Sequence, residues 1–189
     1  MIVSGWNDLY VNALPALMDN IKGHCHSVCG PWAHHFPHLG TPGPSYGYLG
    51  ASLAWWHQWL GNDQIVSQAQ KTHFTFIKES ADPKPFDLSV AGRWIESQTW
   101  PPSIAIKHKY LSKDGLTDKV VNPSPIQIHS PVETGVEAGE WIPHCSGSEI
   151  SGCQKSIDAQ STCFDSDILE KHIDVFGLSL IHISEPTRP

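Results

Sequence analysis

Long apolar runs and clusters of basic residues are both missing from this sequence. Its apolar runs are far shorter than the ~18 residues that a membrane-spanning helix needs, so we expect no membrane partner. The formal net charge is -7 and no basic patch occurs, which disfavours nucleic acid as a partner. Charged residues make up only 16% of the chain and hydrophobic residues 40%, a composition typical of globular rather than disordered proteins.

The cysteines and histidines match no zinc-binding spacing. The chain has five cysteines, an odd number, and lacks an apolar leader after Met1, so the cytoplasm is the default location. His24, Cys25 and His26 alternate between the two faces of a predicted strand and cannot converge on one ion. We therefore expect core thiols at Cys25 and Cys29, no metal and no cofactor. His35 and His38, which follow closely, are interpreted as loop residues.

Strand and helix patterns alternate through the first sixty residues. Residues 2–4 and 24–29 predict short buried strands, and apolar residues at helical spacing predict a helix over 11–21. A strand, a helix and a strand within about thirty residues predict a parallel pair. A second helix is expected over 49–60, with an apolar stripe and a tryptophan cluster interpreted as packing residues: Leu49, Leu53, Trp56 and Leu60 in the stripe, Trp55, Trp56 and Trp59 in the cluster.

The sequence changes character after Asn62. Short strand-like segments occur at 74–77, 104–106 and 126–128, with turn signals at Asp82-Pro83 and Lys113-Asp114-Gly115. This half predicts an antiparallel all-β sandwich, so we place a domain boundary near Asn62. Residues 178–188 read LSLIHISEPTR and look like an in-frame translation of a sequencing adapter, so residues 178–189 are excluded from the fold.

Asp8 and His34 each follow a predicted strand of the parallel pair. Functional groups gather beyond the carboxyl ends of parallel strands, so this carboxylate and imidazole could meet. A carboxylate bonded to Nδ1–H fixes the histidine tautomer and leaves the other nitrogen as a general base. The acid also precedes the histidine in the chain, as α/β hydrolases require. Spacing alone leaves open that the two are unrelated surface groups.

Two motifs surround these residues. Gly5-Trp6-Asn7-Asp8 is followed by Tyr10-Val11-Asn12-Ala13, and Gly30-Pro31-Trp32-Ala33-His34 follows the second predicted strand. They resemble the acid and histidine segments of the cocaine esterase / Xaa-Pro dipeptidyl-peptidase family (CocE/NonD-type hydrolases). The resemblance covers nearly the whole chain up to Gly177, and further segments share it: Pro37-His38, Pro42-Gly43-Pro44, residues 54–60, Gly92-Arg93-Trp94, Trp100-Pro101, residues 138–141 and residues 164–167.

The resemblance implies a partial α/β hydrolase domain, the C-terminal end of its parallel sheet, over residues 1–62. A partial all-β jelly-roll domain of galactose-binding-like type is implied over residues 63–177. Members are serine hydrolases that cleave acyl esters or Xaa-Pro peptides, so a small ester or peptide is the implied substrate. Asp8 corresponds to the orienting acid and His34 to the base, while Trp6 and Trp32 flank them and could shape a substrate pocket.

The nucleophile of this family is not found in the chain. It is expected upstream, on a Gly-x-Ser-x-x-Gly elbow between a strand and a helix. Ser146-Gly147-Ser148 and Ser151-Gly152 follow the histidine, so their chain order is wrong, and Cys153 stands where the family suggests an acidic residue. We therefore expect a fragment that is inactive alone, and its oligomeric state stays open.

Two other interpretations stay open. A β-sandwich can bind carbohydrate through exposed aromatic residues, and Trp94, Trp100 and Trp141 are the candidates for such a platform. Alternatively, the chain does not fold stably alone, because half of a parallel sheet leaves a long unpaired edge.

Overall fold

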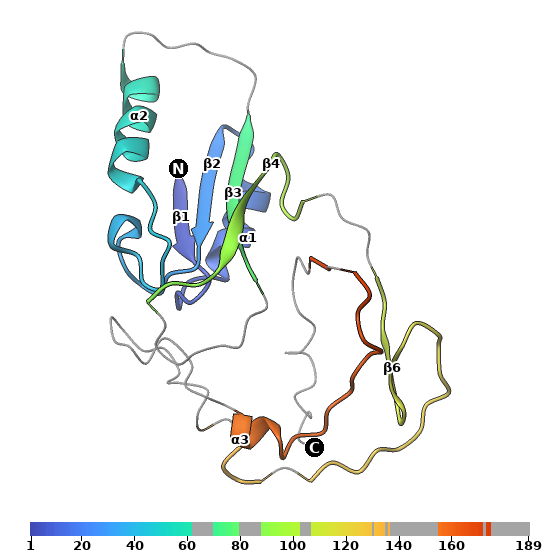
Figure 1. Cartoon of the computed structure of the whole chain (residues 1–189). Helices are drawn as coiled ribbons and strands as arrows, with labels where there is room; N and C mark the ends of the chain where they lie inside the picture. The colour runs from blue at the N-terminus through green and yellow to red at the C-terminus, as the bar shows by residue number, and fades with distance from the viewer. Residues whose placement is uncertain are drawn as a thin grey trace.

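A four-stranded mixed sheet lies at the centre of the N-terminal half (Figure 1). Its strands are β1 (Ile2–Gly5), β2 (Cys25–Gly30), β3 (Lys71–Lys78) and β4 (Gly92–Ser97), in that spatial order. Strands β1, β2 and β3 are parallel, and β4 is antiparallel to β3. The computed structural model describes residues 1–61, 70–79, 88–102, 107–129, 131–134, 136, 155–171 and 173–174.

One helix covers each face of this sheet. Helix α1 (Ala13–Asn20) packs Leu14 and Met18 against Cys29 of β2. Helix α2 (Tyr48–Leu60) lies on the other face, where the Trp55 ring is 6.2 Å from the His26 ring. Both predicted helices are confirmed with slightly different ends. None of the helices among the described residues has the length and apolar content to cross a bilayer.

Strand β2 confirms the alternation predicted for residues 24–29. Cys25 and Cys29 are both free thiols buried toward α1, whereas His26 lies beside Trp55 on the α2 face. Pro15 is the third residue of α1, so the first turn accommodates its missing N–H.

The apolar stripe of α2 faces outward, although an amphipathic helix usually buries such a stripe. Trp55 and Trp59 turn toward the sheet instead, and the Trp59 ring lies 4.5 Å from the His24 ring. Because α2 is apolar on more than one side, the helical period alone does not select the buried face. The four residues of the stripe are between 57% and 74% exposed: Leu49, Leu53, Trp56 and Leu60.

Strands β3 and β4 follow the boundary predicted near Asn62, yet they extend the same sheet. Residues 74–77 are predicted to join an antiparallel sandwich, but β3 pairs in parallel with β2, for example Phe74 with Val28. This placement is therefore corrected. The physical reason is that β3 buries residues on both of its faces, His73 and Phe76 among them, which suits a central strand covered by helices on both sides.

The described residues after Trp100 contain little regular structure. Strands β5 (Tyr110–Ser112) and β6 (Gly115–Thr117) form a hairpin, and α3 spans Lys155–Asp158 (Figure 1). The turn predicted at 113–115 is confirmed, and Gly115 has a φ of 115°, a left-handed value that favours glycine. The strand predicted at 126–128 is wrong, because these residues lie outside any strand and Ile128 is 64% exposed.

Several predictions fall outside the described residues: those for residues 104–106, Trp141, Cys145, Cys153 and the tail 178–189. The jelly-roll domain stays a prediction.

A serine–histidine pair is buried beneath α1. Ser27 and His73 are neighbours on β2 and β3, and they are only 1% and 0% exposed. The Ser27 Oγ lies 2.7 Å from His73 Nδ1 and 3.1 Å from the sulfur of Met18. His73 Nε2 is buried without a hydrogen-bond partner among the described residues. The core of the sheet therefore contains an imidazole that is poorly placed to accept a proton.

Burial lowers the pKa of His73 from its ordinary value of 6.5. The positive charges of Lys71 and of protonated His26 lower the pKa further, while Asp19 on α1 opposes the shift. The folded state therefore favours a neutral ring.

We predict that acid destabilises this sheet through His73. The unfolded chain protonates the ring near pH 6.5, whereas the folded chain resists protonation. The contribution of neutral His73 to the free energy of unfolding is therefore fully present above pH 6.5 and is lost as the pH drops below that value. Urea melts from about pH 8 to about pH 5 measure this slope, and a His73→Gln variant reduces it. An unchanged slope in the variant contradicts the prediction.

Candidate active site

Asp8 lies in a tight turn just beyond β1. Its backbone N–H donates to the Gly5 carbonyl at 3.1 Å, and its Oδ1 accepts the backbone N–H of Tyr10 at 2.8 Å. A short carboxylate that caps its own turn in this way is held in one orientation. The side chain is 13% exposed, so the carboxylate is largely withdrawn from water.

His34 lies beyond the end of β2 and faces this carboxylate. Its Nδ1 is 3.3 Å from Asp8 Oδ1 and 3.2 Å from Oδ2. The Tyr10 ring lies against the imidazole in an edge-on arrangement, with ring centroids 5.5 Å apart. The structure thus brings together the two residues that the sequence singles out, and the contact is made through the nitrogen that an orienting carboxylate requires.

Trp32 anchors the loop that carries His34. It is 1% exposed and packs against Trp94, with ring centroids 6.0 Å apart. Glycines make room for it: a Cβ at Gly30 would lie 2.1 Å from the Trp32 ring, and one at Gly5 would lie 1.9 Å from its carbonyl oxygen. Gly5 and Gly30 end β1 and β2, so the glycines of both motifs serve close packing at the strand ends.

Trp6 and Trp32 do not lie together at the site. Trp32 lines the cavity beside His34 and Asp8. Trp6 instead packs against the α1 core and donates its indole N–H to the Phe76 carbonyl at 2.7 Å. Trp6 does not belong to the cavity lining, so the geometry favours only Trp32 as a pocket residue.

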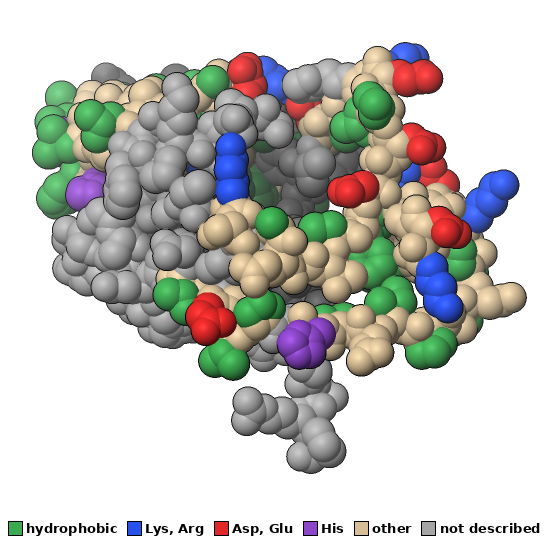
Figure 2. All heavy atoms as spheres, turned by 60° about the horizontal axis from the view of Figure 1, so that its bottom comes forward, with side chains coloured by type: hydrophobic (Ala, Val, Ile, Leu, Met, Phe, Trp, Pro, Cys, Tyr) green, Lys and Arg blue, Asp and Glu red, His purple; other side chains and the backbone are tan. Residues whose placement is uncertain are grey.

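A cavity of about 410 Å³ adjoins the pair. Phe36 and Leu39 lie on its outer side, where they are 69% and 66% exposed. Figure 2 shows hydrophobic side chains gathered at the left border, on the side where α2 and the short helix η1 (Pro37–Leu39) lie in Figure 1. The cavity is lined by Val3, Ser4, Asp8, Trp32, His34, His35, Phe36, Pro37, Leu39 and Tyr48.

Most of this lining was not identifiable from sequence. His35 is predicted as an ordinary loop residue, yet it lines the cavity next to His34. Phe36 and Leu39 belong to a Gly/Pro-rich stretch with no periodicity. Their apolar character, unusual in such a loop, is the one signal that could have indicated a binding surface.

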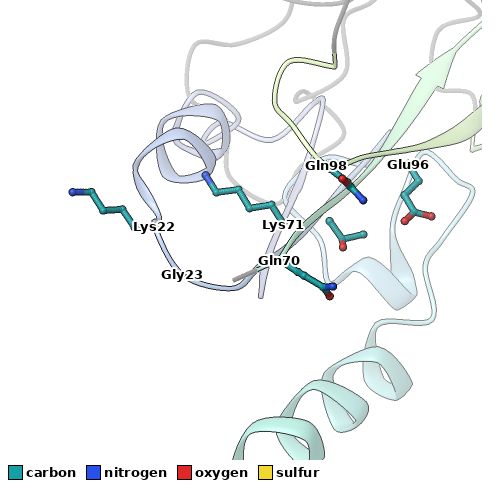
Figure 3. Close-up of a pocket in the computed structure, with 7 residues that line it drawn as sticks. Lys22, Gly23, Gln70, Lys71, Glu96 and Gln98 are labelled. Atoms are coloured by element: carbon teal, nitrogen blue, oxygen red, sulfur yellow. The ribbon is translucent and has the colours of Figure 1, made fainter. Parts of the chain in front are cut away.

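A second cavity, of about 560 Å³, lies at the opposite end of the sheet, where the parallel strands β2 and β3 begin (Figure 3). Its two lysines, Lys22 and Lys71, point away from the other polar side chains. Lys22 extends away from the cavity in Figure 3, and the Lys71 ammonium donates to the Met18 carbonyl at 2.9 Å. This cavity therefore supports no site.

Of the tryptophans proposed for a carbohydrate platform, the two that the structure describes, Trp94 and Trp100, are not brought together. Trp94 packs with Phe76 on the α2 face, with ring centroids 5.3 Å apart. Trp100 packs with Trp6 against the α1 core on the other face. Within the described ranges, no group of three or more histidine, cysteine or acidic side chains could hold a metal ion. The geometry of the described residues therefore points to Asp8 and His34.

Comparison with family models, curated proteins and solved structures finds no match to this chain. Membership of a hydrolase family is therefore an expectation from the sequence motifs, to which these comparisons add nothing.

We predict that Gly30→Ala destabilises the fold by roughly 1–3 kcal/mol, because the added methyl group overlaps the Trp32 ring. Gly50→Ala in α2 is the matched control, since a Cβ there meets nothing within 4 Å. Alanine at that helical position is expected to raise the free energy of unfolding by about 0.5–1 kcal/mol. Urea melts of both variants check this, and equal effects at the two positions contradict the packing role of Trp32.

Proposed function

We propose that this chain is part of a serine hydrolase that cleaves acyl esters or Xaa-Pro peptides with a Ser-Asp-His triad. One observation carries the proposal: His34 Nδ1 lies 3.2 Å from Asp8 Oδ2 at the carboxyl ends of two adjacent parallel strands. Functional groups of open parallel sheets gather beyond the carboxyl ends of the strands, so this edge is a fitting place for a catalytic pair.

The chemistry follows from this contact. When Asp8 accepts the Nδ1–H of His34, the lone pair of Nε2 can take the proton of a serine hydroxyl. The serine oxygen then attacks the substrate carbonyl, and the protonated imidazole returns the proton to the leaving alcohol or amine. Asp8 stabilises the imidazolium that forms between the two steps. A water molecule repeats the sequence to release the acyl group.

The described residues do not supply the nucleophile in the expected form. Ser4 lines the cavity, but it lies within β1 rather than on a turn between a strand and a helix. Ser27 contacts a histidine, but this pair is buried under α1 and closed to a substrate. In the chain order of α/β hydrolases the nucleophile precedes the acid, so the proposal assigns it to a segment upstream of Asp8 that this sequence does not contain.

The cavity beside His34 favours an apolar group in the substrate. Its lining combines aromatic and aliphatic side chains with the polar pair at one end, which is the usual make-up of a small-molecule site. Either the acyl group or the leaving group of a substrate fits such a cavity. The proposal therefore includes both acyl esters and Xaa-Pro peptides as substrates.

We predict that His34→Ala lowers kcat of the full-length parent protein by ~10³-fold or more, because triad residues act as a unit. Asp8→Asn is expected to lower kcat by a comparable factor through loss of the correct tautomer. Hydrolysis of a p-nitrophenyl ester and of an Xaa-Pro anilide measures both effects. His57→Ala, on the exposed surface of α2, is the matched control. Full activity in the His34→Ala protein overturns the proposal.

A further inference from the structure

Asn7 connects the ends of three strands immediately before Asp8. Its side-chain Nδ2 donates to the Pro31 carbonyl at 2.7 Å, and its backbone N–H donates to the Trp32 carbonyl at 3.2 Å. Its Oδ1 accepts a hydrogen bond from Lys78 Nζ at 3.4 Å. Pro31 and Trp32 follow β2 on the way to His34, and Lys78 ends β3.

The strand ladder no longer holds the two loops where Asn7 acts. Regular pairing of β1 with β2 ends at Gly5 and Gly30, and one backbone bond, from the Trp6 N–H to the Gly30 carbonyl, follows it. Beyond that point, the two hydrogen bonds from Asn7 to Pro31 and Trp32 tie the Asp8 turn to the His34 segment. The relative position of the catalytic pair therefore depends on this residue.

The Asp8–His34 contact is sensitive to such positioning. Its two distances, 3.2 Å and 3.3 Å, are longer than the 2.7–2.9 Å typical of charge-assisted hydrogen bonds. A small separation of the loops would carry both oxygens beyond hydrogen-bonding range, because such bonds weaken steeply with distance and angle. The Asp8–His34 contact therefore tolerates little further lengthening.

An amide is suited to this place because it offers a donor and an acceptor on one planar group. The donor meets the neutral Pro31 carbonyl and the acceptor meets the Lys78 ammonium group. A carboxylate would lose the donor, and an aliphatic side chain would lose both. Desolvation lowers the pKa of Lys78 from its ordinary 10.5.

We propose that Asn7 is a positioning residue that holds Asp8 in hydrogen-bonding contact with His34. This inference rests on the proposed function, in which that contact fixes the tautomer of the catalytic base. It goes beyond the triad, because Asn7 itself touches neither the reacting atoms nor the imidazole.

The test is an NMR experiment on the 189-residue chain with ¹⁵N-labelled histidine. The Nδ1–H resonance of His34 is assigned by its loss in His34→Gln, since the chain has 12 histidines. In the parent sequence we expect the Nδ1-protonated tautomer. In Asn7→Ala we expect this proton to exchange with water at least ~5-fold faster, the factor that one net hydrogen bond typically contributes.

The matched control is Asn20→Ala, which removes a side-chain hydrogen bond of the same 2.7 Å length at the end of α1, away from the pair. This variant is expected to leave the His34 resonance unchanged, although both alanine variants lose one asparagine. Circular dichroism shows whether each variant is folded. If Asn7→Ala unfolds, Asn7→Ser decides, because its short hydroxyl keeps a polar group but cannot reach both partners.

Asp8→Asn separates the two possible failures. If it leaves the His34 signal unchanged, Asp8 is not the partner of His34, and the proposed function fails together with this inference. If Asp8→Asn alters the signal but folded Asn7 variants do not, the positioning role is overturned and the triad assignment stands. If the His34 signal is altered in Asp8→Asn and in the Asn7 variants but not in Asn20→Ala, the positioning role is supported.

Discussion

The parallel pairing of β1 with β2 puts the ends of both strands at one edge of the sheet. Because the two strands run in the same direction, the residues that follow Gly5 and Gly30 must emerge side by side. Backbone hydrogen bonds from Trp6 and Asn7 to the β2 segment continue this pairing into the loops. An antiparallel arrangement would have sent Asp8 and His34 to opposite ends of the sheet, so the contact between them depends on this pairing.

Side chains from the layers around the sheet pack near that edge. Helix α1 buries Leu14 and Met18 on one face, and Trp32 fills the other face where the glycines leave space for a ring. Among the described strands, β1 pairs with β2 alone, and the apolar cavity opens next to it. The strand ends that carry Asp8 and His34 are therefore packed on the side of the sheet, while the cavity beside the pair is open to a ligand. This is the arrangement in which a general base can meet a substrate and a nucleophile carried by another segment.

Sequence patterns predicted the parts of this structure that depend on local chemistry. The turn at Lys113-Asp114-Gly115 and the burial of Cys25 and Cys29 follow from backbone preference and strand alternation. The meeting of Asp8 with His34 follows from strand direction. The partner of β3 could not be predicted, because its burial on both faces reflects the helices that pack there. The contacts of Asn7, and the placing of Phe36 and Leu39 in the cavity lining, depend on how loops distant in sequence fold together. No local sequence period encodes this.

The central claim is that Asp8 and His34 serve a serine nucleophile carried by another part of the same protein. Sequencing the source DNA across the region that precedes Met1 tests it most directly. The account predicts an open reading frame that continues upstream and encodes a Gly-x-Ser-x-x-Gly elbow between a strand and a helix. A stop codon directly before Met1, or an upstream frame without such an elbow, would contradict it and leave the pair without a reaction to catalyse.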